Sequence, residues 1–244
     1  MNEARPPLFA GRYYFADPGR LRVAVESFIE DAAQVRLPNA PVGLLVPHGS
    51  LMQLGLLIGA AYKQTLFFPA QGRVALIVPT AAQDKALLCD PRPAYRTPLG
   101  ELPVDHVSIQ HLHASGAPIT LGEDIEPIVE TQALFILSAF GETPILPLRV
   151  PAGLPSDVEL RLPGDVLVIV AANADGEVNL AQALERVALP QSPNALRRFL
   201  RSRQGHSPEQ SALRLGLSAM RALGARHGRI LLRAGDYVSG AVYP

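Results

Sequence analysis

Cysteine and long apolar runs are both scarce in this chain. Cys89 is the single cysteine among 244 residues, so an internal disulfide framework is excluded and a reducing compartment suits the protein. No run of about 18 apolar residues is present to span a bilayer, and the N-terminus lacks the basic and then apolar pattern of a signal peptide. The sequence therefore predicts a soluble, cytoplasmic protein without a membrane partner.

An excess of either charge is also missing. The 22 basic and 22 acidic residues cancel, so nothing global draws the chain to nucleic acid or to an anionic membrane. The distribution is uneven, because residues 191–235 hold nine arginines and a single acid, Glu209. We interpret this arginine-rich segment as a solvated helix surface, and an anion-binding or partner-docking face is the alternative.

What is abundant is apolar sequence of strand length. With 48% hydrophobic residues the chain can bury a full core, and we expect one domain over residues 1–244. Apolar runs at 42–46 and 73–79 flank a segment with helical spacing, which predicts a βαβ unit with parallel strands and a right-handed crossover. The predicted fold is α/β, with a mostly parallel central sheet flanked by helices.

The remaining elements follow from caps, prolines and periodicity. Three prolines make residues 80–102 mostly loop, with Cys89 inside it, and Pro147 gives the strand at 145–150 an edge position or an early end. Further strands are predicted at 165–172, 229–233 and 237–243, with a turn at 173–176. Helices are predicted at 18–34, 123–139, 180–187, 194–203 and 208–223, the last with Ser207 as its N-cap.

The segment 42–63 carries the first candidate site residue. Its apolar strand stops at Pro47, and His48 and Gly49 then lead into the helical stretch. Ligands of open α/β sheets bind outside the carboxyl ends of strands, so His48 stands where chemistry is usually done. The alternative is that His48 only forms hydrogen bonds within its turn.

A second group of histidines has the wrong spacing for a metal chelate. His106, His111 and His113 lie close in sequence, but only His106 and His113 share a helical face, and two turns separate them. We therefore expect no metal site from this group.

Five segments in unbroken order together resemble the MEMO family, the B component of the AmmeMemoRadiSam set. GRYYFADPGRL (11–21) is similar to the family's aromatic-rich opening, VPHGS (46–50) to its V-P-H-A-G-Y turn, and RTPLGELPVD (96–105) to its T-P-L-G segment that ends in V-D. EPIVETQALF with FGETPILPL (126–148) is similar to E-H-S-I-E-V-Q-L-P-F with the following F-G-x-x-x-I-V-P. AGDYVSGAVY (234–243) is similar to the closing S-G-D…V-V-G-Y.

The resemblance implies the fold of the class III extradiol ring-cleavage dioxygenases, in which two histidines and a carboxylate hold iron(II). His48 stands at the position of one family histidine, the one in the V-P-H-A-G-Y turn. The histidine of G-P-x-H is absent from VPTAA (78–82), and that of E-H-S has become Pro127. The S-D-x-x-H-Y motif appears as AANADGEVN (171–179). One imidazole with assorted carboxylates is a poor transition-metal site, so the resemblance implies a degenerate metal centre.

The favoured hypothesis is a non-catalytic MEMO-like protein with a cleft for a partner or small ligand around His48. We expect no cofactor, and the partners implied are radical-SAM and AMMECR-type proteins. The cleft candidates are His48, Ser50, Thr80, Glu126, Glu130, Asp175 and Asp236.

Two other functions remain open. One is an iron- or copper-dependent oxidoreductase with a rearranged ligand set, in which carboxylates supply oxygens around His48. The other is a metal-free hydrolase built on His48, Ser50 and Asp175, although HGS is not the G-x-S-x-G elbow. Glu126 and Glu130 also have a plain interpretation, as solvated side chains or as groups bonded to the start of their helix.

Overall fold

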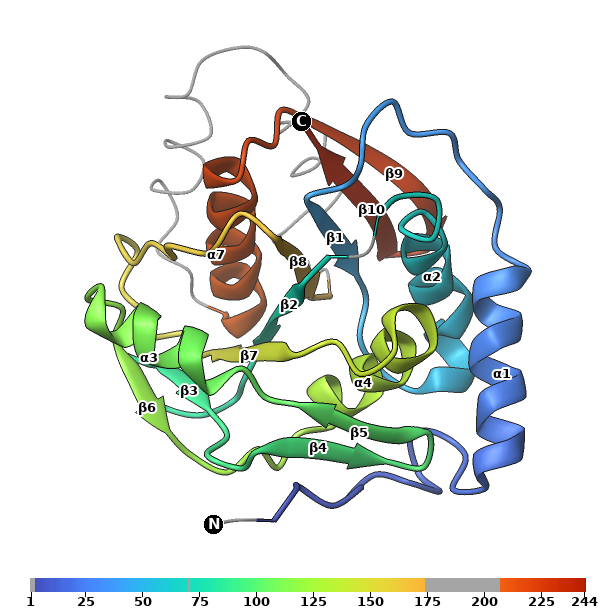
Figure 1. The fold of residues 1–244 in the computed structure, drawn as a ribbon, viewed down its shortest axis with the longest axis horizontal. Coiled ribbons are helices and arrows are strands. Elements are labelled where there is room, and N and C mark those ends of the chain that lie inside the picture. Colours follow the sequence, from blue (N-terminus) through green and yellow to red (C-terminus); the bar gives the residue numbers. More distant parts are fainter. Residues whose placement is uncertain (1–2, 70, 174–206) are drawn as a thin grey trace.

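An eight-stranded mixed sheet runs through the centre of the molecule (Figure 1), in the order β6-β3-β7-β2-β8-β1-β10-β9. The computed structural model describes residues 3–69, 71–173 and 207–244. A separate hairpin pairs β4 with β5. The strands are β1 (Gly43–Val46), β2 (Arg73–Pro79), β3 (Leu87–Cys89), β4 (Ala94–Thr97), β5 (Gly100–Pro103), β6 (Ile119–Leu121), β7 (Ile145–Val150), β8 (Val166–Ala171), β9 (His227–Ala234) and β10 (Tyr237–Tyr243).

The centre of the sheet is parallel and its flanks are partly antiparallel. Strands β7, β2, β8 and β1 are parallel neighbours, whereas β10 joins β1 antiparallel and β3 joins β7 antiparallel. The four residues of β1, the six of β7 and the six of β8 are all buried, as continuous apolar runs require when helices cover both faces. β1 and β2 lie in one parallel sheet as predicted, with β8 inserted between them.

Helices cover the two faces in unequal layers. In Figure 1, α1, α2 and α4 pack together on one side of the sheet and α7 lies on the other. Gly59 of α2 lets α1 approach closely, because a Cβ there would stand 2.1 Å from the backbone oxygen of Phe28. The helices are α1 (Pro18–Glu30), α2 (Leu51–Lys63), α3 (His106–Ala114), α4 (Pro127–Phe140) and α7 (Pro208–Ala222). None of these described helices combines the length and apolarity that a membrane span needs.

Side-chain caps fix where the helices begin. Asp17 accepts a hydrogen bond from the Arg20 amide and Ser207 caps α7 in the same way, each followed by proline at the first helical position. Two helices are shorter at one end than predicted. α1 ends at Glu30 rather than near residue 34, and α4 begins at Pro127 rather than at 123.

The prediction that residues 80–102 are mostly loop missed three short strands. Prolines exclude a long helix there, but they leave room for three short strands, β3, β4 and β5. Cys89 ends β3 and is fully buried, and its thiol pKa is raised to about 12 by burial. The β4–β5 hairpin packs on α4, and the N-terminal segment pairs with it, since the Arg5 amide donates to the Ala94 carbonyl.

The edge position or early end predicted from Pro147 was also wrong, because β7 is an interior strand that continues to Val150. The Val74 amide of β2 donates to the Pro144 carbonyl, so the backbone N–H and C=O groups of even-numbered residues in β7 point toward β2. The backbone of Pro147 therefore points toward β3. β3 pairs with β7 at Arg149, beyond the proline. The N–H that Pro147 lacks is therefore not needed for the hydrogen bonds between β7 and β2.

The two terminal strands are present as predicted, with β9 beginning two residues earlier than residue 229, and they pair as an antiparallel hairpin. The helices predicted at 180–187 and 194–203, and residues 174–176 of the predicted turn, lie outside the described residues.

We expect Gly59→Ala to lower the free energy of unfolding by about 1 to 3 kcal/mol, because the new methyl group would collide with backbone that cannot rotate away. Gly164→Ala is the matched control, since a Cβ there meets nothing within 4 Å. Urea denaturation of both variants measures the difference. Equal stability of the two variants would contradict the close approach of α1 to α2.

Candidate functional site

The carboxyl ends of β1, β2 and β8 meet at one edge of the sheet. Three polar residues follow these strands directly or after one residue: His48 after β1, Thr80 after β2 and Asn173 after β8. The first turn of α7 brings Glu209 to the same edge, where it contacts two of them. We call His48, Asn173 and Glu209 the carboxyl-edge site.

A single carboxylate joins the members of this site. Glu209 Oε1 lies 2.7 Å from His48 Nε2, and Glu209 Oε2 accepts a hydrogen bond of 2.8 Å from the Asn173 amide. Asn173 in turn brackets the backbone of His48, because its Oδ1 accepts from the His48 amide at 3.0 Å and its Nδ2 donates to the His48 carbonyl at 2.9 Å. The β1 turn, the end of β8 and the start of α7 are therefore tied together.

These contacts determine how the imidazole can act. An ionised carboxylate only accepts, so the proton shared with Glu209 belongs to His48 Nε2. Nδ1 makes no hydrogen bond to any described residue. The side chains of His48 and Glu209 are 16% and 18% exposed, so the pair is largely shielded from water. Glu209 fixes the orientation of the ring and leaves Nδ1 for another group.

Ser50 lies beside this pair in sequence but makes no bond to it. It is the N-cap of α2, yet its side chain makes no capping hydrogen bond, and within the described chain its hydroxyl has no partner. A nucleophile and its base need to lie within hydrogen-bond reach of each other. The structure has no such bond between Ser50 and His48.

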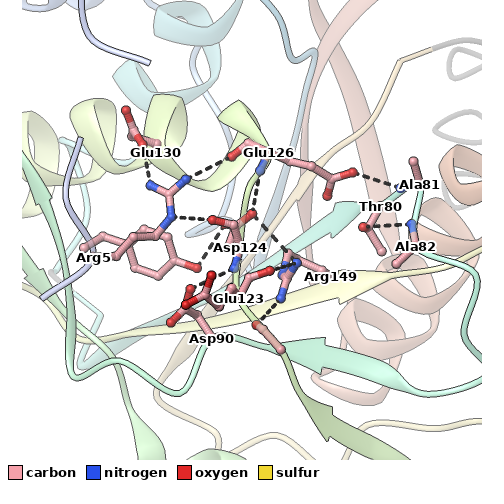
Figure 2. Close-up of polar contacts among 12 residues, drawn as sticks. Arg5, Thr80, Ala81, Ala82, Asp90, Glu123, Asp124, Glu126, Glu130 and Arg149 are labelled. Carbon is pink, nitrogen blue, oxygen red and sulfur yellow. Dashed lines mark hydrogen bonds and ion pairs between the residues drawn. The ribbon is translucent and has the colours of Figure 1, made fainter. Parts of the chain in front are cut away.

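Thr80 and Glu126 form a second polar group, beyond the end of β2. Glu126 Oε1 accepts from the Ala81 amide at 2.9 Å, and Thr80 Oγ1 accepts from the Ala82 amide at 3.3 Å (Figure 2). Thr80 is buried, and Glu126 Oε2 is a buried atom without a hydrogen-bond partner among the described residues. The carboxylate of Glu126 therefore has one oxygen left to bond.

Glu130 has no such spare capacity. It is fully buried on α4 and forms an ion pair with Arg5, accepts from the Tyr14 hydroxyl, and accepts from the amides of Leu8 and Phe9 at 3.1 and 2.9 Å. Burial and the neighbouring carboxylate raise the pKa of Tyr14 well above its ordinary value, so the phenol stays protonated and donates. These contacts fasten the N-terminal segment onto α4.

Asp124 continues this buried ionic network (Figure 2). Its oxygens accept from the Tyr95 hydroxyl and the Glu126 amide, each at 3.0 Å, and Arg149 lies 3.9 Å away. Burial raises the pKa of Asp124, with the Arg149 and Arg5 guanidiniums opposing the shift. The network is packed beside the carboxyl edge and holds Glu126 in place.

Two candidates remain. Asp236 is exposed in the turn between β9 and β10, and Asp175 lies outside the described residues.

Glu209 and Asn173 were missed as site residues. Ser207 and Pro208 place Glu209 in the first turn of a helix, but nothing in the sequence points that helix at His48.

The described residues do not supply a metal site. Across residues 3–69, 71–173 and 207–244, no three histidine, cysteine, aspartate or glutamate residues converge closely enough to hold an ion. Nε2 of His48 is engaged by Glu209, and Oδ1 of Asn173 is engaged by the His48 amide. Among the described residues, this donor set lacks the three protein ligands that a non-haem iron centre needs.

Comparison with known proteins identifies relatives of the chain. Residues 5–161 match the sequence model of a family described as Memo-like protein. A protein of Sulfolobus acidocaldarius described as a MEMO1 family protein is 27% identical in an alignment of 194 residues that covers 73% of this chain and 68% of that relative. The α/β architecture with its large mixed sheet is consistent with this family.

We expect Glu130→Gln to destabilise the fold by about 3 to 5 kcal/mol, because it leaves the Arg5 guanidinium buried without its counter-charge. Glu142→Gln, at an exposed position beyond α4, is the matched control and should stay within about 0.5 kcal/mol of the parent. Thermal and urea unfolding provide the measurement. A cost below about 1 kcal/mol would show that Glu130 does not hold the N-terminal segment.

Proposed function

Because the chain belongs to the Memo-like protein family, we propose that it is a non-catalytic binding member of that family, with a degenerate metal site and a ligand or partner cleft around His48. The observation that carries the proposal is the contact of 2.7 Å between His48 Nε2 and Glu209 Oε1. A carboxylate of the protein itself engages Nε2, so only Nδ1 of the ring is left to bind a further group. The contact belongs to the folded chain and requires no ion.

Two further observations support the loss of metal chemistry. Among the described residues, His48 is the one histidine on a turn that follows a central parallel strand. The corresponding turn after β2 presents Thr80 and Ala81. Pro127 opens α4 where the family motif has a histidine. A borderline ion held by one imidazole and one carboxylate would exchange with water.

A binding role is supported by polar atoms left without partners at the carboxyl edge. His48 Nδ1, the Ser50 hydroxyl and Glu126 Oε2 form no hydrogen bond in the part of the chain that the structure describes. Of these three atoms, Glu126 Oε2 is buried, and because buried polar groups are normally satisfied, it favours a bound group that completes it. A ligand with both donor and acceptor atoms suits this set.

The family resemblance suggests the partners. We propose an accessory role in the cytoplasm beside radical-SAM and AMMECR-type proteins. The gene neighbourhood tests this directly: adjacent genes for both partner types would support the role, and their absence across related genomes would count against it.

Metal content separates this proposal from its main alternative. We expect protein purified without chelators to carry iron, copper and zinc well below one equivalent per chain, and His48→Ala to leave that content unchanged. Elemental analysis gives the measurement, with His113→Ala, an exposed histidine of α3, as the control. Near-stoichiometric metal that disappears only in His48→Ala would overturn the proposal.

The alternative, an iron- or copper-dependent oxidoreductase, has one observation in its favour, the adjacency of an imidazole and a carboxylate. It requires dioxygen consumption with an aromatic diol that depends on added iron(II) and is lost in Glu209→Gln. If oxygen uptake is the same with and without iron(II) across a panel of diols, the non-catalytic proposal stands.

A further inference from the structure

A pocket lies at the opposite edge of the sheet from His48. It has a volume of about 310 Å³ and opens between α3 and residues 161–163, beside Arg73 at the start of β2. Its polar wall carries Arg73, His111 and Arg161, and its apolar wall carries Leu112, Leu162 and Pro163. Small-molecule sites in proteins start at about this volume and combine an apolar wall with a few polar groups.

Arg73 is a fixed part of the wall, and its charge is already compensated. Its Nη1 donates to Asp105 at 2.9 Å and to Ser108 at 3.1 Å, and its Nε lies 3.4 Å from Asp165. Burial raises the pKa of Asp105, but hydrogen bonds from Ser108 and the Arg73 guanidinium bring it below its usual value, so Asp105 is ionised at neutral pH. Arg73 therefore shapes the pocket without attracting a further anion.

Arg161 is different. It is exposed, and within residues 3–69, 71–173 and 207–244 its guanidinium makes no hydrogen bond or ion pair. It lines the pocket together with His111, which is also exposed, and with the apolar side chains. A free guanidinium is the group best suited to a planar carboxylate, which it can bind through two parallel hydrogen bonds.

We propose that this pocket binds a small carboxylic acid with an apolar body, its carboxylate on Arg161 and its hydrocarbon part against Leu112, Leu162 and Pro163. The fold brings the parts of the site together, since α3 supplies His111 and Leu112 and the segment before β8 supplies Arg161, Leu162 and Pro163. This site is separate from the proposed cleft around His48 and does not depend on it.

The local charge balance favours a monoanion over phosphate. Arg73 pairs with the carboxylates of Asp105 and Asp165, and Arg161 adds a second positive charge to the lining, so the charges of these four groups cancel. A dianion would be repelled by the two carboxylates more strongly than a monoanion is. An apolar wall also gains nothing from inorganic phosphate, whereas it removes the body of an organic acid from water.

Calorimetric titration with benzoate tests the proposal. We expect a dissociation constant on the order of 1 mM or tighter, which suits a ligand of this size. Inorganic phosphate and benzyl alcohol should each bind at least about 10-fold more weakly, because each lacks one half of the recognition. Binding of phosphate as tight as that of benzoate would overturn the assignment to an organic acid.

Two variants locate the site. Arg161→Ala should weaken benzoate at least about 10-fold, and Val107→Glu, which adds a negative charge at the exposed rim, should weaken it as well. Arg12→Ala, an exposed arginine without a side-chain partner among the described residues, is the control and should bind as the parent does. Undiminished binding in Arg161→Ala, or no binding by the parent protein, would refute the proposal.

Discussion

Burial of the parallel strands on both faces is the constraint on which the rest of this structure depends. Strands β7, β2, β8 and β1 can hydrogen-bond side by side in one direction only if each returns through a crossover, and the crossovers place helices on both faces. Parallel strands also end together. Their shared direction gathers the turns after β1, β2 and β8 at one edge and so creates the place where a site can form.

The ionic network beside that edge shows how the fold holds its N-terminal segment. Arg5, Asp124, Glu130 and Arg149 are buried, and burying charge is costly unless it is paired and hydrogen-bonded. Their pairing links segments more than 100 residues apart, from the N-terminus to the start of α4. One result is that Glu126, at the N-cap of α4, is presented to the turn after β2 with an oxygen to spare.

At the carboxyl edge, the contact between His48 and Glu209 gives the proposed function its physical basis. A histidine at such a turn can bind a further group only through a ring nitrogen that is not already engaged. Here a carboxylate from a distant helix binds one ring nitrogen, and an asparagine side chain fixes the backbone of the same turn. The pocket on Arg161 faces the other way and offers a free charge, so the two edges suit different ligands.

The sequence by itself determined the local features, because caps, apolar runs and proline positions act on neighbouring residues. It placed β2, the start of α7 at Ser207 and Pro208, and the turn of His48 at the end of a strand. The sequence did not predict features that depend on contacts between residues far apart in the chain. Only the tertiary structure decided that β8 lies between β1 and β2, that Pro147 could sit in an interior strand, and that Glu209 meets His48, because these contacts join residues far apart in the chain, where sequence spacing carries no information about distance.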